Sequence, residues 1–341
     1  MGDWRTDPSF AMCRALVDGA ELAAFVDGPF DVRAVVAAIR PDAKGGFLLD
    51  EVPWENFPQG DRVREAVRLL HADAPARAGT GVVGGMCAND MRAAAALAVP
   101  FMARIAADTS HPHRVDALAE LSSPARARHF GVASRDELLL HRSDAGSDLY
   151  DDYGVEVTGY PAGWSVAAAR HAITANTALL QPLLDDPDPT VRVHAAYALA
   201  TAADPRRIVR SALRTRFAVE QDPTVRAALV LAIAEATRAQ PHVLTTAWMQ
   251  DLLRDRTQAP EVRLAAAIGW LCLTDEPAPE DLRVTVDDLA TDERAHAMEA
   301  LPWMAAAGGS GEMGLRRCVR QMLHPESPEP VGHDDPWALR H

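Results

Sequence analysis

The sequence predicts an all-α fold, an α-solenoid in which pairs of helices stack on one another. Three observations predict it: a short recurring motif, a column of small residues behind that motif, and an alanine-rich composition. The chain has 341 residues, of which 64 are alanine and 6% are aromatic. Alanine has the highest helix propensity, and residues that favour strands are few.

A Pro-x-Val-Arg motif occurs three times, at residues 189–192, 223–226 and 260–263. Its copies begin 34 and 37 residues apart, a spacing typical of stacked helical repeats. The positions four, seven and eight after each valine carry apolar residues or glycine, which indicates one face of a helix. The residues seven positions on are all small, namely Ala198, Ala232 and Gly269, so neighbouring helices can approach closely.

Each motif is expected to begin the second helix of a pair. Asp188-Pro189 and Asp222-Pro223 predict a turn with proline near the first helical position. An amphipathic segment precedes each motif and predicts the first helix of the pair. These segments are 173–184, 206–219 and 243–254.

Weaker patterns extend the array in both directions, and they divide the chain into six parts. Further helices are expected to begin near Arg62 and to span 93–107, 114–121, 281–289 and 293–304. The predicted parts are an N-terminal helical cap (1–50), degenerate helix pairs (51–122), an insertion (123–164), the clear repeats (165–275), a degenerate C-terminal repeat and cap (276–323) and a flexible acidic, proline-rich tail (324–341).

The repeated residues resemble the HEAT repeat family, and the segment from Val52 to Phe101 is similar to HEAT-containing bacterial proteins of unassigned role. The resemblance implies a right-handed superhelical array. It also implies a ladder in which an acidic turn residue bonds the arginine of the motif. Asp186 with Arg192 and Glu220 with Arg226 fit that pattern. The third copy departs from it, because Thr257 stands where the acid is expected.

The insertion at 123–164 is the main candidate for a binding surface. From residue 134 to 160 it holds seven acidic residues and two arginines, a net charge of −5. Insertions in solenoids often project from the binding face, and tyrosines and carboxylates suit a protein interface. We expect a basic protein partner here; the alternative is a solvated linker. The candidate binding residues are Tyr150, Asp151, Asp152, Tyr153, Tyr160 and Trp164.

A second candidate surface lies along the motif helices, which would line the concave face of a solenoid. His194 and Tyr197 lie beside the predicted core positions there. The arginines of the three motifs also form a spaced line, but the internal ladder is the favoured explanation for them.

The net charge of −14 disfavours duplex DNA and anionic membranes as partners. No secretory signal and no apolar run of about 18 residues is present, so we expect a cytoplasmic protein without a membrane span. Because no two of the four cysteines lie within four residues, reduced thiols are expected rather than a zinc or redox pair.

The sequence contains no motif for catalysis, cofactor binding or metal binding. The glycine-rich segment 79–85 lacks the Lys-Ser/Thr of a phosphate loop, and the acidic run at 185–188 is interrupted by proline as a turn would be. We therefore predict a non-enzymatic protein-protein interaction scaffold with no cofactor and no metal. The alternative is a HEAT-like enzyme or enzyme helper, similar to bilin lyases or DNA glycosylases.

Overall fold

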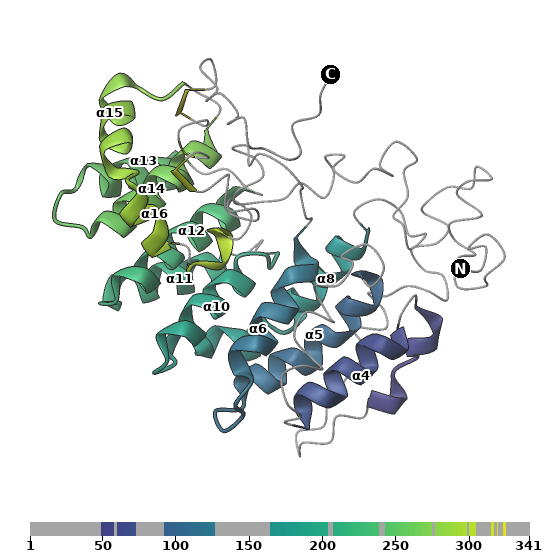
Figure 1. The fold of residues 1–341 in the computed structure, drawn as a ribbon. Helices are drawn as coiled ribbons and strands as arrows, with labels where there is room; N and C mark the ends of the chain where they lie inside the picture. The colour runs from purple at the N-terminus through teal and green to yellow at the C-terminus, as the bar shows by residue number, and fades with distance from the viewer. Residues whose placement is uncertain are drawn as a thin grey trace, which may run out of the picture. The chain divides into compact units, whose positions relative to one another are not determined.

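A computed structural model of the chain describes most of the predicted helical segments. The described residues are 49–57, 60–72, 92–126, 164–203, 207–238, 243–274, 277–298, 300–304 and five between 315 and 324, namely 315, 316, 319, 323 and 324. Every regular element in these ranges is an α-helix or a short 3₁₀ helix, which confirms the all-α class (Figure 1). None of the described helices is long and apolar enough to cross a bilayer.

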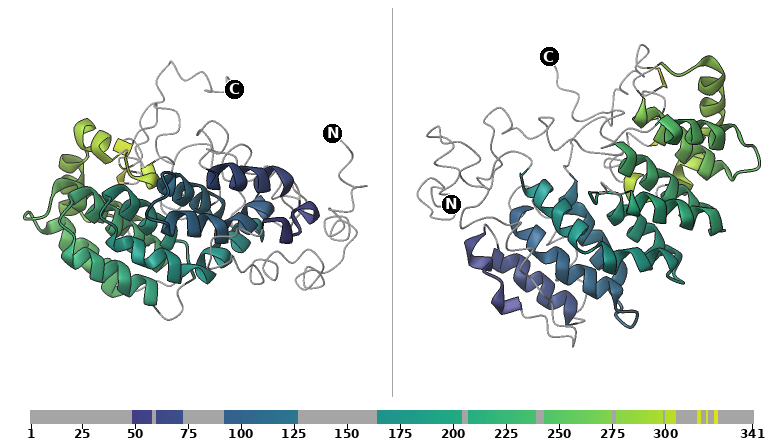
Figure 2. Two further views of the ribbon diagram at one scale, coloured as in Figure 1. Left: turned by 90° about the horizontal axis from the view of Figure 1, so that it is seen from below. Right: turned by 180° about the vertical axis from the view of Figure 1, so that it is seen from behind.

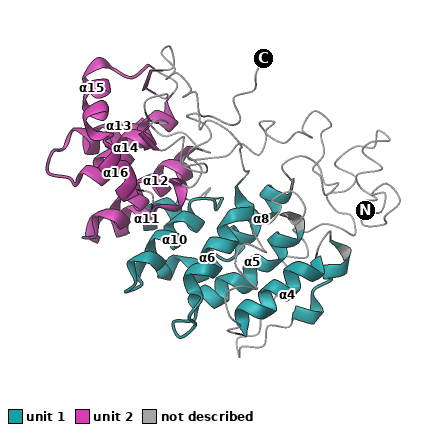
Figure 3. Cartoon of the chain, viewed as in Figure 1, with its two compact units in different colours: residues 1–128, 142–212 teal, residues 129–141, 213–341 magenta. Residues whose placement is uncertain are grey.

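The chain divides into two compact units (Figure 3). Unit 1 comprises residues 1–128 and 142–212, and unit 2 comprises 129–141 and 213–341. The division falls within helix α11 (Ile208–Val219).

Unit 1 is a cluster of helices around α5 (Arg92–Ala107), which packs against α4 (Gly60–His71), α6 and α8. Helix α6 in turn packs against α10 (Pro189–Leu199), the helix of the first motif. The other elements of this unit are η3 (Leu49–Glu51), η4 (Trp54–Asn56), α6 (Arg114–Ser122), η5 (Ser123–Ala125), α8 (Trp164–Ala175), α9 (Thr177–Leu180) and η7 (Gln181–Asp185).

Unit 2 is built around α14 (Pro260–Leu273), the helix of the third motif. It packs along α12 (Pro223–Arg238), the helix of the second motif, and also contacts α13, α15 and α16. Figure 2 shows the ribbon from two further sides. The remaining elements are α13 (Val243–Arg254), α15 (Glu280–Leu289), α16 (Asp292–Met298) and η8 (Pro302–Met304). The indole of Trp303 is buried here and donates to Glu235 Oε2 of α12 over 2.7 Å.

The three motifs occupy equivalent places in their own helices. Each proline is the first residue of its helix, and the valines Val191, Val225 and Val262 are all buried. The residues four, seven and eight positions after each valine are buried as well. Asp188 and Asp222 cap their helices, because each accepts a hydrogen bond from the backbone amide of the threonine two residues on.

The helices that precede the second and third motifs lie close to the predicted ranges, but two details differ. The predicted helix over 173–184 is broken into α8, α9 and η7, because the chain leaves helical geometry at Asn176. The side-chain amide of Asn176 donates to the carbonyl of Ala172 and ends the last turn of α8. Likewise, the predicted helix over 293–304 is divided into α16 and η8.

Gly269 lies where α14 approaches both α12 and α13 closely. A Cβ atom built at this position would lie 2.7 Å from Met249 Sδ of α13 and 3.0 Å from Ala234 Cβ of α12. The small residue predicted at this position is therefore required by the close packing of both α12 and α13.

We predict that Gly269→Val destabilises unit 2 by about 1–3 kcal/mol, because the added atoms overlap two packed helices. Ala247→Val introduces the same β-branched side chain at an exposed position of α13 and serves as the control. Urea denaturation followed by circular dichroism measures both. Equal stability of the two variants would show that α12, α13 and α14 do not meet at Gly269.

Candidate functional site

Several arginines donate hydrogen bonds to main-chain carbonyls near the ends of the helices that precede them. Five arginines lie at or near the start of a second helix, and each donates to a main-chain carbonyl six to ten residues earlier in the chain. The bonds are Arg114 Nε to Ala106 O (2.9 Å), Arg192 Nη1 to Asp186 O (2.8 Å), Arg226 Nη1 to Glu220 O (3.0 Å), Arg263 Nε to Leu253 O (2.9 Å) and Arg294 Nη1 to Asp288 O (3.0 Å). These carbonyls would otherwise lack a partner, since the last turn of a helix leaves its acceptors unpaired.

Two of these arginines also reach forward to a later turn of the same unit. In unit 1, the guanidinium of Arg114 forms a buried ion pair with the carboxylate of Asp186. In unit 2, Arg226 Nη2 donates to Gln258 Oε1 over 2.9 Å. Each arginine thus ties its own turn to the next one, which we call a rung.

This arrangement corrects the expected ladder. Arg192 contacts the main-chain oxygen of Asp186 rather than its carboxylate. The carboxylate of Glu220 accepts from Arg216 (2.7 Å), while Arg226 takes the Glu220 carbonyl. In the third copy the acceptor is Gln258, next to Thr257, so an amide replaces the carboxylate. The three motif arginines therefore bond backward to carbonyls, and Arg226 also bonds forward to a side chain.

The next rung of unit 2 is not formed among the described residues, and we call it the open rung. By the same pattern Arg263 would pair with Asp288, which precedes Arg294 by six residues as Asp186 precedes Arg192. In the described part of the chain no hydrogen bond or ion pair joins these two side chains, and Asp288 is exposed. Both instead line a pocket of about 390 Å³.

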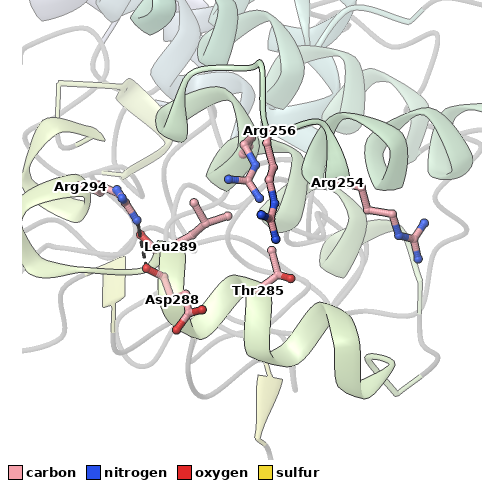
Figure 4. A pocket seen from close by; sticks show the side chains of 7 residues that line it. Arg254, Arg256, Thr285, Asp288, Leu289 and Arg294 are labelled. Atoms are coloured by element: carbon pink, nitrogen blue, oxygen red, sulfur yellow. Dashed lines mark hydrogen bonds between the residues drawn. The ribbon is translucent and has the colours of Figure 1, made fainter.

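The pocket collects side chains from four helices and one turn of unit 2 (Figure 4). In Figure 4, Arg256 extends from the α13–α14 turn toward Thr285 on α15, while Arg294 lies at the other side and Arg254 is set apart. The lining residues are Arg254, Arg256, Arg263, Thr285, Asp288, Leu289 and Arg294. Four cationic side chains thus face one carboxylate.

The positive charges in the pocket are only partly balanced. Burial lowers the pKa of Arg263, and the nearby charges of Arg256 and Arg294 lower it further, against the opposing effect of Asp255. The oxygens of Asp255 accept from Thr257 and Gln258, and these bonds hold its pKa at about 2. Asp255 therefore stays ionised but directs its hydrogen bonds into its own turn.

Several guanidinium donors in the pocket are not used by other described residues. Arg256 makes no hydrogen bond or ion pair within the described ranges, and Arg254 has one exposed contact, to Asp281 at 3.7 Å. Arg263 donates through Nε alone, and Arg294 through Nη1. Planar guanidinium groups with unused N–H donors are suited to bind carboxylates and phosphates in a bidentate manner.

Only some candidate residues of the sequence analysis are among the described residues. Tyr150, Asp151, Asp152, Tyr153 and Tyr160 fall outside the described residues, and Trp164 is the first residue of α8. The expectation of a basic partner at the insertion therefore stays a prediction.

His194 and Tyr197, both on α10, take part in the packing of unit 1. The guanidinium of Arg126 lies 3.4 Å from the centre of the Tyr197 ring and donates to the Tyr197 carbonyl over 2.6 Å. Burial lowers the pKa of His194, with Asp116 partly opposing this shift. The structure brings these two residues together on one helix, apart from any described pocket.

No sequence pattern identified Arg254, Arg256, Thr285, Asp288 or Arg294 as site residues. One signal was available for two of them, because Asp288 and Arg294 repeat the six-residue spacing of Asp186 and Arg192. The other three follow no repeat and converge only in the folded unit.

Metal binding finds no support in the described ranges, where no three His, Cys, Asp or Glu side chains come together as ligands would. Cys272, which is buried in α14, has a free thiol. Comparison with known proteins gives no match to a family model, a curated protein or a solved structure.

We predict that Arg114→Met destabilises unit 1 by about 3–5 kcal/mol, because it leaves the buried carboxylate of Asp186 without its cation. Burial opposes ionisation of Asp186, but hydrogen bonds from Arg114 and from the Asp188 amide lower its pKa below the usual 3.8. A depressed folded-state pKa contributes stability that is complete above the unfolded value and is lost as pH falls through the folded value.

The stability difference between the native chain and Asp186→Asn is therefore expected to be largest above about pH 4 and to shrink in stronger acid. Urea denaturation between neutral and acid pH measures it. A difference that does not change with pH would contradict the ion pair as its origin.

Proposed function

We propose that the protein is a non-enzymatic scaffold of stacked, HEAT-like helix pairs that binds an acidic segment of a protein partner in the arginine-lined pocket of unit 2. The open rung at Arg263 and Asp288 carries this proposal. Where Arg114 and Arg226 find an acceptor on the next turn of their own unit, the pocket offers donors to an acceptor from outside.

The chemistry of the lining supports binding rather than catalysis. Arginine is always protonated at physiological pH and presents a fork of donors, so it holds anions without transferring protons. The Thr285 hydroxyl donates to the Asp281 carbonyl over 2.8 Å, as a helical threonine commonly does. Leu289 adds an apolar contact for the carbon atoms of a bound side chain.

A protein segment fits the surroundings of the pocket better than a nucleic acid does. Nucleic acid needs cations that follow its backbone along a groove. Here α15 carries three exposed carboxylates: Asp288 lines the pocket, Asp281 contacts Arg254, and Asp287 lies on the same helix. Together with the net charge of −14, these carboxylates favour a short acidic ligand over a polyanion.

Fluorescence anisotropy with a labelled hexaglutamate peptide tests the proposal, with hexaglutamine as the uncharged probe. We expect hexaglutamate alone to bind, and Arg256→Gln to weaken its binding about three- to tenfold, since one charge-assisted contact is lost. Arg62→Gln removes the same charge from an exposed site on α4 of unit 1 and is expected to leave binding unchanged. Equal losses in the two variants would refute the pocket as the binding site.

A further inference from the structure

We propose that the group held in the pocket is a phosphate monoester, carried on a serine or threonine of the partner, so that phosphorylation controls binding. This inference rests on the proposed function and names the ligand of the same site. It follows from the charge of the pocket, the directions of its donors and its size.

The charge of the pocket matches a dianion. Its lining has four arginines and one aspartate, and Arg254 is shared with Asp281 at 3.7 Å. Arg256, Arg263 and Arg294 then outweigh Asp288 by two positive charges. A carboxylate compensates for one of them, whereas a phosphate monoester carries about −1.5 to −2 at neutral pH.

The donors reach the pocket from three different places on the chain. Arg256 comes from the α13–α14 turn, Arg263 from the first turn of α14 and Arg294 from α16. A carboxylate has two oxygens in one plane, and a single guanidinium satisfies both. A phosphate monoester has three terminal oxygens in a tetrahedral arrangement, so it can accept hydrogen bonds from several arginines at once.

Electrostatic repulsion between arginines in the pocket also favours a bound dianion. Burial lowers the pKa of Arg263, and the charges of Arg256 and Arg294 lower it further, so Arg263 is repelled by both cations in a partly buried site. A bound dianion would relieve this repulsion, as the carboxylate of Asp186 compensates Arg114 in unit 1.

The size of the pocket favours a phosphorylated side chain over a free ion. Its volume of about 390 Å³ is near the lower end of ligand pockets, which span about 300–1,000 Å³. That space exceeds what one phosphate group fills and leaves room for the side chain that carries it. Leu289 offers the apolar contact that such carbon atoms need.

The test compares three labelled peptides that differ at one central residue between glycines: phosphoserine, glutamate and serine. At pH 7.5 we expect the phosphoserine peptide to bind at least about tenfold more tightly than the glutamate peptide, since it gains charge and donors. Its affinity is expected to fall as the pH drops through the second phosphate pKa of about 6. Inorganic phosphate should compete at high concentration, and acetate at the same concentration should not.

Arg256→Gln, with Arg62→Gln as the control, tests whether the preference for the phosphoserine peptide arises in the pocket. Preference for phosphoserine that disappears in Arg256→Gln and persists in Arg62→Gln supports the inference. Equal binding of the phosphoserine and glutamate peptides, both dependent on Arg256, would overturn the phosphate assignment and leave the proposed function standing. No Arg256-dependent binding of these peptides or of hexaglutamate would overturn both.

Discussion

The helix pairs of this protein depend on arginines that satisfy main-chain carbonyls at the turns between helices. The last turn of a helix leaves carbonyl oxygens without a partner in the helix, and an unpaired acceptor is costly where it is buried. Arg114, Arg192, Arg226, Arg263 and Arg294 meet this need in their own turns. Because each side chain has five N–H donors and spends few of them on the turn, donors remain for a second acceptor.

The arginines differ in whether those remaining donors find an acceptor on another turn of the same unit. Arg114 and Arg226 spend them on Asp186 and Gln258, which makes the turn-to-turn contact internal. Arg263 has no such partner among the described residues, and Arg256 adds a second cation to the same space. One contact thus stabilises the helix pairs where it is closed, and we propose that it forms a binding site where it is open.

The sequence was sufficient to place the three motif helices. The spacing of Val191, Val225 and Val262 predicted three helices with one buried face, and the small residue at 269 predicted close packing. The break at Asn176 was missed, because apolar periodicity continues across it while a side-chain hydrogen bond ends the helix. The pocket was missed for a different reason: Arg254 and Arg256 follow no period, and their meeting with Thr285 and Arg294 depends on how α15 and α16 fold back onto α14.

The most direct test of the open rung is to supply the missing acceptor by a substitution in the pocket itself. Thr285→Glu places a carboxylate among the pocket arginines, and Val284→Glu places one at an exposed neighbouring position of α15. Differential scanning calorimetry measures the melting temperatures with and without the phosphoserine peptide. Without peptide, Thr285→Glu is expected to melt about 2–4 °C above the native chain, and Val284→Glu is not. The peptide is expected to leave the melting temperature of Thr285→Glu unchanged. A Thr285→Glu chain that melts like Val284→Glu and still responds to the peptide would contradict the account.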